Sequence, residues 1–361
     1  MGKQRFLEAK GLRRLTRLWK SGKHDTLAPM PTPASTLRKE QGISPSVATT
    51  NTSIEPSTSE PMLDQPYGVL EWSTSPQPIM DICFVHGLIG DRNRTWTAAG
   101  EEVPWPKLLL APELKNARIL TYGYDAYPTR RGMVSGNRVT DHASNLLADL
   151  TTNRASCQAQ TRPLIFIVHS LGGIVCKKAL LLSRDHHETY YQGLFNSCKG
   201  IIFLGTPHTG SWMANWAQIP ASALGVMKGI NRPLLDILEP DSELLESIQV
   251  DFTRLLLQMA NTHSRLEIAC FFEELPLPVV GKVVAKDSAT IPGYTSISIH
   301  ADHREMVRFK SPHDRGFTQI LGFLQRWQEE VRYVHNPSTC HLPYLPTDQS
   351  IHDDQSGTDI W

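Results

Sequence analysis

The stretch "PLIFIVHSLGGIVCKKAL", residues 163–180, constrains the fold more than any other part of the chain. An apolar run leads directly into Ser170, and two glycines then precede a helical pattern. A continuous apolar run is typical of a strand that is covered on both faces, as in a parallel sheet. The stretch therefore predicts a buried strand, a sharp turn at Ser170 and a helix, in that order.

The same succession of patterns extends along most of the chain. Strands are expected at residues 80–87, 117–124, 163–170, 198–205, 265–272 and 294–301. Helices are expected at residues 103–110, 136–150, 171–183 and 314–331, with a mainly helical cap or lid insertion at residues 206–262. Because the strands are apolar throughout and alternate with helices, the predicted fold class is α/β, with a mostly parallel, doubly wound sheet.

Composition divides the chain into four segments. Residues 1–25 carry eight Lys or Arg, and a helical wheel places their apolar side chains opposite the basic ones. This basic amphipathic segment has three interpretations: a mitochondrial presequence, an anchor on an anionic membrane surface, or a solvated arm. Residues 26–66 are rich in Pro, Ser and Thr and are expected to be a disordered linker. The folded domain is expected at residues 67–333, followed by a disordered tail at residues 334–361.

Charge and cysteine content narrow the classes of partner. The chain has 36 Lys and Arg against 36 Asp and Glu, so no overall positive charge favours nucleic acid, and no nucleic-acid partner is expected. Its six cysteines have no CxxC spacing, which favours a reducing, intracellular compartment and argues against a zinc site. Given the basic segment, the expected location is cytoplasmic, mitochondrial or at a membrane periphery. No apolar run approaches the roughly 18 residues of a membrane-spanning helix.

Ser170 lies in a variant of the nucleophile elbow, G-x-S-x-G, in which a serine occupies a strained turn between a strand and a helix. In this chain the five residues are Val-His-Ser-Leu-Gly, so Gly172 keeps the second glycine and Val168 replaces the first. The alternative is that Ser170 only caps the following helix. Since a cap requires no glycine, the pattern predicts a nucleophile at Ser170.

A second loop, "FVHGLIGD" at residues 84–91, follows an earlier strand. A His-Gly loop at that position can direct a backbone N–H toward the oxyanion of an acyl-transfer reaction. Leu88 is the expected donor, together with the N–H of Leu171. The alternative is a tight glycine turn. Neither loop has the GxGxxG or GxxxxGK[ST] pattern, so no nucleotide cofactor is expected.

A general base is expected after the last strand, because in this fold the order along the chain is Ser, acid, His. Three histidines end or follow that strand: His300, His303 and His313. His300 belongs to the strand itself, whereas His303 lies just beyond it, on the loop from which a base can reach Ser170. His303 is therefore the predicted base.

The orienting acid has several candidates. Glu273 and Glu274 directly follow the strand at residues 265–272, where the carboxylate of such a triad is expected. Asp287 is a rival, and Asp302 flanks the predicted base. The residues alone leave this choice open.

Several motifs taken together resemble a known family. They are "FVHGLIGD" (84–91), "IVHSLGGIVCKKAL" (167–180), "FLGTPHTGS" (203–211), "FFEELP" (271–276), "KDSA" (286–289) and "ADHREMVRF" (301–309). Over about residues 67–330 the chain resembles serine esterases and lipase-like α/β-hydrolases. It looks most like serine-active-site-containing proteins linked to phospholipid remodelling and the hydrolase modules that precede NACHT or NB-ARC domains in fungal proteins. The resemblance implies Ser170 as nucleophile, His303 as base and Glu273 as acid.

The expected function is hydrolysis of a carboxylic ester through an acyl-enzyme, without a cofactor or metal. The insertion carries several apolar side chains, among them Trp212 and Trp216, which would line an acyl-chain pocket or form a lid. The alternative is that they form the insertion's own core. A lipid or another hydrophobic ester is the expected substrate. Two other classes stay open: an acyltransferase or thioesterase-like biosynthetic enzyme, and a hydrolase-shaped interaction or signalling module without turnover.

Overall fold

The computed structural model describes residues 66–87, 90–125, 136–209, 242–260, 265–278 and 280–335. The expected basic segment at residues 1–25, nearly all of the linker and nearly all of the tail lie outside these ranges. So does most of the insertion, residues 210–241, which includes Trp212 and Trp216.

One seven-stranded sheet organises the described part of the chain. Its strands are β1 (Gly68–Ser73), β2 (Met80–Val85), β3 (Ala117–Gly123), β4 (Leu164–His169), β5 (Cys198–Leu204), β6 (Glu267–Glu273) and β7 (Thr295–Ile299). The spatial order is β1-β3-β2-β4-β5-β6-β7. Only β1 runs antiparallel to its neighbour, and all the other pairs are parallel.

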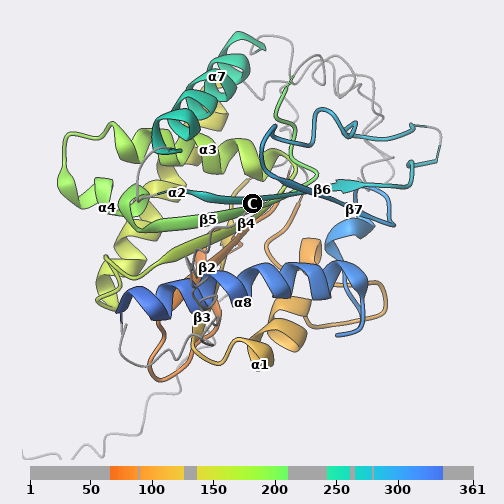
Figure 1. Cartoon of the computed structure of the whole chain (residues 1–361), viewed down its shortest axis with the longest axis horizontal. Coiled ribbons are helices and arrows are strands. Elements are labelled where there is room, and N and C mark those ends of the chain that lie inside the picture. Colours follow the sequence, from red (N-terminus) through yellow and green to blue (C-terminus); the bar gives the residue numbers. More distant parts are fainter. Residues whose placement is uncertain are drawn as a thin grey trace, which may run out of the picture. The chain divides into compact units, whose positions relative to one another are not determined.

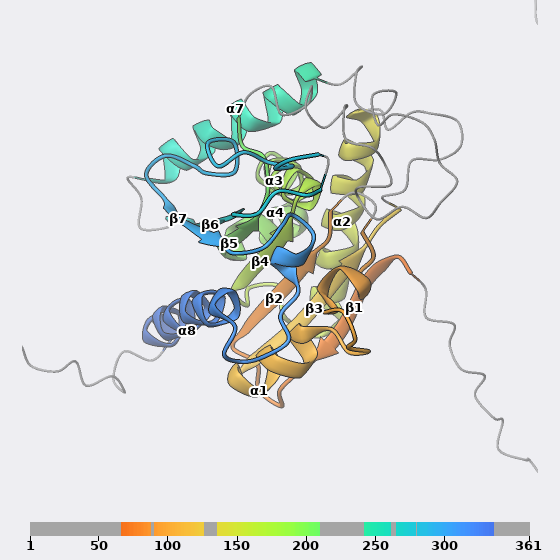
Figure 2. The same cartoon turned by 90° about the vertical axis from the view of Figure 1, so that its right-hand side faces the viewer.

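Helices cover both faces of this sheet (Figures 1 and 2). They are α1 (Ala111–Glu113), α2 (Gly136–Ser156), α3 (Leu171–Arg184), α4 (Thr189–Ser197), α7 (Ser242–Met259) and α8 (Arg315–His335). Side chains of α2, α3, α4 and α7 pack in one apolar cluster with the sheet, and those of α8 pack in a second cluster. This is a doubly wound, mostly parallel sheet with the α/β-hydrolase fold, as the sequence predicts.

The central strands are apolar at every position because both of their faces are covered. In β4, Phe166 and Val168 belong to the cluster under α3, whereas Ile165 and Ile167 belong to the cluster under α8. All four side chains are fully buried. The period of two along the strand sends successive side chains to opposite faces, so a strand between two helical layers must be apolar throughout.

Two elements were not anticipated from the sequence. Strand β1 has an intermediate burial pattern and lies at the edge of the sheet, so it has no continuous apolar run to mark it. Helix α4 is short, and only Leu194 and Ser197 are buried in it. Helix α8 also continues to His335, two residues past the expected end of the domain. Among the described helices, none combines the length and the apolar character that crossing a bilayer requires.

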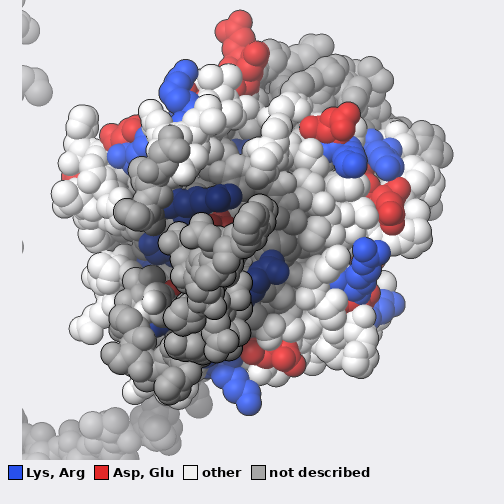
Figure 3. All heavy atoms as spheres, in the orientation of Figure 1, with Lys and Arg blue, Asp and Glu red and all other residues white. Residues whose placement is uncertain are grey.

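The described cysteines are free thiols, and the described surface carries charges of both signs. Cys83, Cys176, Cys198 and Cys270 are buried and Cys157 is exposed, and all five are free thiols. Burial raises the pKa of the Cys198 thiol to about 12. On the face drawn in Figure 3, acidic and basic side chains of the described residues are interspersed.

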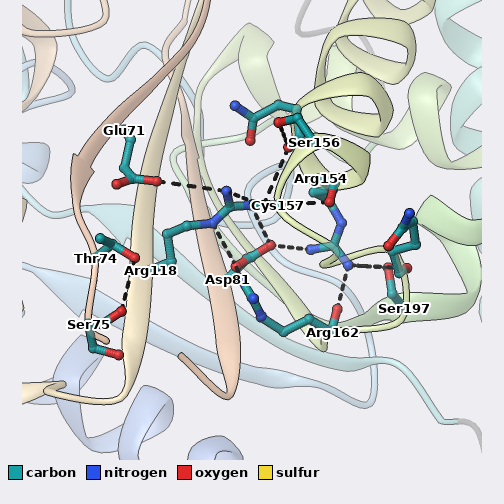
Figure 4. A network of polar contacts seen from close by, with 12 residues as sticks. Glu71, Thr74, Ser75, Asp81, Arg118, Arg154, Ser156, Cys157, Arg162 and Ser197 are labelled. Atoms are coloured by element: carbon teal, nitrogen blue, oxygen red, sulfur yellow. Dashed lines mark hydrogen bonds and ion pairs between the residues drawn. The ribbon is translucent and has the colours of Figure 1, made fainter. Parts of the chain in front are cut away.

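A buried cluster of charges ties the amino ends of the strands to α2 (Figure 4). The carboxylate of Asp81, in β2, is fully buried and accepts two hydrogen bonds from Arg118 in β3, at 3.0 and 2.9 Å. Arg154 of α2 and Arg162 also donate to it, at 2.5 and 2.9 Å. Three guanidinium groups therefore depend on one carboxylate for their nearest negative charge.

Replacement of that carboxylate should destabilise the fold strongly. In Asp81→Asn the three guanidinium groups lose their shared counter-charge while two of them stay buried, so we expect a loss of about 3–5 kcal/mol in the free energy of unfolding. Urea unfolding followed by circular dichroism measures it. Asp185→Asn is the control: its partner Arg184 forms a surface pair with it, and such pairs contribute at most about 1 kcal/mol. Equal losses in the two variants would contradict the account.

Candidate active site

Ser170 occupies the turn between β4 and α3 in a conformation that side chains rarely adopt. Its φ is 54° and its ψ is −127°, and Gln158 is the only other non-glycine residue of the described chain with a positive φ. Such a conformation costs on the order of 1–3 kcal/mol and persists only where the surroundings impose it. Ser170 stands at the cap position of α3, but its side chain makes no capping hydrogen bond. The interpretation of Ser170 as an ordinary helix cap is therefore wrong.

The strained turn is held by the strand next to it and by close backbone packing. The N–H of Ser170 donates to the carbonyl of Leu204, at the end of β5, at 2.9 Å, and the hydroxyl of Thr206 donates to the Ser170 carbonyl at 3.1 Å. A β-carbon on Gly172 would lie 2.2 Å from the carbonyl oxygen of His86, and one on Gly173 would lie 2.3 Å from the Thr206 hydroxyl. Both glycines are therefore required by close approach.

The missing first glycine of the elbow has a structural explanation. Val168 is part of β4, pairs with Phe203 in β5, and its side chain is fully buried in the core. The close approach to Ser170 falls instead on Gly87 of the earlier loop, where a β-carbon would lie 2.8 Å from the β-carbon of Ser170. The departure at position 168 therefore leaves the turn intact.

The Ser170 hydroxyl is enclosed but unbonded. Ser170 is 2% exposed, and within the described part of the chain its Oγ has no hydrogen-bond partner. Buried hydroxyls are normally paired, so an exception calls for a specific cause, and reactivity is one of the recognised causes.

Glu273 and His303 come together beside this turn. Glu273 is the last residue of β6, and one of its carboxylate oxygens lies 2.8 Å from Nδ1 of His303, on the loop after β7. The other oxygen accepts the N–H of Val284 at 3.0 Å. Both side chains are almost completely buried, at 1% and 2% exposure. The pair is thus shielded from water, and a charge interaction is stronger in the protein interior than in water.

His303 and Ser170 contact the same dipeptide, Leu204 and Gly205. The Leu204 carbonyl accepts the Ser170 N–H, and a β-carbon on Gly205 would lie 2.9 Å from Cε1 and 3.0 Å from Nδ1 of the His303 ring. The turn after β5 therefore brings the serine and the histidine to the same place, and Gly205, with a φ of 57°, leaves room for the ring.

His169, the residue before Ser170, is a further site residue that the sequence interpretation did not single out. Its Nε2 lies 3.0 Å from the carbonyl oxygen of His303, which can only accept, so Nε2 carries the proton. The two rings lie 4.8 Å apart between centroids. Burial, followed by the neighbouring His303, holds the pKa of His169 well below its usual value. A neutral His169 therefore tethers the loop of His303 to the elbow.

The rival acids have other positions. Glu274 is exposed and pairs with the exposed His300 at 2.8 Å, and the hydrogen bond from His300 lowers the pKa of Glu274. Asp302 accepts the N–H groups of Arg304 and Glu305, at 2.9 and 3.0 Å, and so shapes the loop of His303.

The remaining rivals are also placed elsewhere. Asp287 is exposed, and its backbone carbonyl accepts the Thr209 hydroxyl at 3.4 Å. His313 is exposed, and its N–H donates to the Ser311 hydroxyl at 3.1 Å. Among the candidates of the described chain, Glu273 and His303 form the buried pair of an acid and a histidine, whereas Glu274 and His300 form an exposed one.

Of the two expected oxyanion donors, Leu171 lies within the described residues and Leu88 does not. Leu171 is the first residue of α3 and 4% exposed, and the N–H groups of a first helical turn have no partner within the helix. Leu88 lies outside the described residues.

A buried amine in α3 was also not anticipated. Lys177 of α3 is fully buried, and its Nζ lies 2.6 Å from Nδ1 of His208 and 2.6 Å from the side-chain oxygen of Gln249 in α7. It also lies 5.2 Å from the ring centroids of Phe203 and Phe252. Burial lowers the pKa of Lys177 to about 7. The signal in the sequence was a lysine on the inner face of an apolar helix.

Comparison with known proteins gives partial likenesses. No protein-family model matches the chain. It is similar to Protein SERAC1 of Mus musculus, with 30% identity over 197 residues, which is 49% of this chain and 28% of that protein. For Protein SERAC1 of Bos taurus the identity is 26% over 279 residues, 69% of this chain and 39% of that protein. The chain thus spans between 28% and 39% of the length of these curated relatives.

Solved structures resemble the chain at lower identity. An esterase from Thermogutta terrifontis has 13% identity and a TM-score of 0.41, with 73% of this chain and 93% of that chain covered. The carboxylesterase CesB from Bacillus subtilis has 12% identity and a TM-score of 0.37, with coverage of 72% and 88%.

Lys177 should make stability depend on pH in a defined direction. Its folded pKa of about 7 lies below the 10.5 of a free lysine, so between these values the unfolded state holds more protons and stability rises with pH. The free energy of unfolding of the native chain, relative to Lys177→Met, should rise by up to about 1.4 kcal/mol per pH unit in this window. Urea unfolding at a series of pH values measures the difference.

Lys178, the half-buried residue after Lys177, supplies the control for this prediction. Lys178→Met removes the same charge from the same helix at a less buried position, so it measures the effect of losing a lysine from this helix without the burial. Parallel curves for Lys177→Met and the native chain would show that the buried amine does not titrate as described.

Proposed function

We propose that this chain is a serine hydrolase that cleaves a carboxylic ester of a lipid or of another hydrophobic acyl compound. Ser170 is the nucleophile, His303 the general base and Glu273 the acid that orients the base. The N–H groups of Leu88 and Leu171 are the proposed oxyanion donors.

One observation carries the proposal: a strained Ser170, whose hydroxyl has no partner in the described chain, and the buried pair of His303 and Glu273 both lie at the turn after β5. The contact of 2.8 Å between Glu273 and Nδ1 of His303 favours a proton on that nitrogen, which leaves Nε2 as the base. The carboxylate also stabilises the imidazolium that forms when His303 takes a proton. The second carboxylate oxygen is fixed by the N–H of Val284, so the acid cannot rotate away without loss of that bond.

The proposed reaction has two halves. Nε2 of His303 takes the Ser170 proton while Oγ attacks the ester carbonyl, and the carbonyl oxygen becomes an oxyanion. The bond to the leaving alkoxide then breaks, the His303 proton passes to it, and an acyl-enzyme remains. Water, deprotonated by His303, attacks the acyl-enzyme, and the acid is released with Ser170 restored.

The substrate class rests on the sequence of segments that lie outside the described residues. Apolar residues of the insertion, including Trp212 and Trp216, would contact an acyl chain. The basic amphipathic segment, residues 1–25, would contact an anionic membrane surface. Both features favour a lipid-like ester over a small polar one.

The first half-reaction is tested with a fluorophosphonate probe, which forms a covalent bond with an activated serine. Ser170→Ala should abolish labelling, and His303→Ala should slow it by several orders of magnitude. Glu273→Gln should slow it as well, by less. Rates of labelling, followed by in-gel fluorescence, measure these effects. A folded native chain that is not labelled would contradict the proposal.

Glu274 and His300, which form an exposed pair next to the site, supply matched controls. His300→Ala and Glu274→Gln make the same chemical changes at a histidine and a glutamate that lie on the same loops but pair with each other. Their labelling rates should stay within about twofold of the native chain, because exposed pairs of this kind contribute little. Added alcohol in an ester assay then distinguishes release of acid from transfer to the alcohol.

A further inference from the structure

His169 connects the proposed nucleophile to the proposed base within one residue. It precedes Ser170 in the chain, and Nε2 of its ring donates to the backbone carbonyl of His303 at 3.0 Å. The path from nucleophile to base therefore runs through one peptide bond, one side chain and one hydrogen bond, although His169 and His303 are 134 positions apart in sequence.

The carbonyl that accepts this hydrogen bond belongs to the residue whose ring must be aligned. Nδ1 of His303 lies 2.8 Å from an oxygen of Glu273, and a β-carbon on Gly205 would come within 2.9 Å of Cε1. These contacts act on the ring, whereas His169 acts on the backbone of the same residue. The base is thus held at both ends, and a shift of its loop away from the serine turn requires loss of the bond from His169.

The donor is itself placed by the sheet. His169 is the last residue of β4 and pairs with Leu204 of β5 in the parallel ladder. Its side chain is 8% exposed, and its ring lies 4.8 Å from the His303 ring between centroids, with the planes at 40°. A hydrogen bond in such an enclosed place is stronger than one in water. A strand end, rather than a loop, therefore holds the backbone of the base.

His169 supplies a donor without supplying a charge. Burial is the largest cause that holds its pKa well below the usual value, followed by the neighbouring His303, and Arg308 and His86 act in the same direction. The hydrogen bond to the His303 carbonyl opposes them, and none of the groups named is an acid. A neutral His169 neither competes for the serine proton nor repels the imidazolium that forms on His303.

We propose that His169 is a positioning residue for the reaction: the N–H at its Nε2 holds the backbone of His303 so that the imidazole of His303 stays directed at Ser170. The inference rests on the proposed function. It adds that His169 takes no proton itself and acts through His303. Loss of the bond should therefore slow proton transfer and leave ester binding unchanged, because alignment of reacting groups contributes to the rate.

His169→Gln and His169→Met test this role as a matched pair. Both replacements are unbranched and of similar length, but only the amide nitrogen of Gln can donate from the place of Nε2. With a p-nitrophenyl ester and the full chain, we expect kcat of His169→Met to fall about tenfold or more at nearly unchanged KM, whereas His169→Gln stays within about threefold of the native chain. Equal kcat in the two variants would overturn the inference.

The same two replacements at the exposed His300 are the control. His300 lies three residues before His303, but its Nδ1 faces Glu274. Both His300→Gln and His300→Met should keep kcat within about twofold of the native chain, because an exposed pair contributes little. A loss in His300→Met as large as that in His169→Met would show that replacement near this loop suffices, and it would overturn the assignment to the hydrogen bond from Nε2.

The pH profile tests the neutral state of His169. On the acid side, kcat/KM of the native chain should fall about tenfold per pH unit, because His303 alone of the two histidines takes a proton. The profile of His169→Met should have the same slope at a lower level. A native slope of about a hundredfold per pH unit that halves on the logarithmic scale in His169→Met would show that His169 also takes a proton, and it would overturn the neutral donor.

The inference and the proposed function fail in different ways. A native chain without ester turnover or probe labelling overturns the proposed function, whereas an active native chain with an equally active His169→Met overturns only the role of His169. If His169→Met melts far below the native chain, His169→Asn replaces it. Its amide is one methylene shorter and falls short of the His303 carbonyl, so its kcat should lie well below that of His169→Gln, and equal values would overturn the inference.

Discussion

The strained backbone of Ser170 is the constraint on which the other features of the site depend. A non-glycine residue at a φ of 54° is stable only if its neighbours compensate for its strain, and here they are the Leu204 carbonyl, the Thr206 hydroxyl and the two glycines that open α3. The same turn after β5 accommodates the His303 ring. The strained turn at Ser170, the turn after β5 and the loop that carries His303 are thus held in one fixed arrangement.

The parallel sheet supplies that arrangement. β4, β6 and β7 end at one edge, and the residues that follow or close them are Ser170, Glu273 and His303. Loops at the carboxyl ends of parallel strands converge there, which is why ligand and catalytic sites of open α/β sheets lie at this edge. Glu273 and His303 are 30 positions apart in sequence, but their strands are hydrogen-bonded neighbours.

Much of this was predictable because it is encoded locally. The apolar run before Ser170 and the glycines after it fix a buried strand, a turn and a helix within 18 residues. The preference for His303 over His300 followed from an expected strand boundary that was wrong: β7 ends at Ile299, so His300 lies just beyond the strand, where it is exposed and pairs with Glu274. The choice of Glu273 over Glu274 did not follow from the residues: adjacent strand residues point to opposite sides, and only the structure shows which one faces the histidine.

Features that depend on pairing between distant segments were not predictable in this way. The edge strand β1 has no continuous apolar run. The sequence around Lys177 shows only a helical pattern, and the contacts of this lysine with His208 and Gln249 are formed only in the folded chain. The hydrogen bond from the Tyr124 hydroxyl to the His86 carbonyl joins residues 38 positions apart. In each case the local sequence fits several environments, and tertiary packing selects one.

The position of the Asp81 cluster has a consequence for how such a protein can diverge. Asp81 and Arg118 are each the second residue of their strands, whereas Ser170 and Glu273 lie where strands end. The buried charge cluster and the candidate site thus lie at opposite ends of the strands. Loops at the end of the strands that holds the candidate site can accumulate substitutions while the opposite end preserves folding, so such a site can change without loss of the fold.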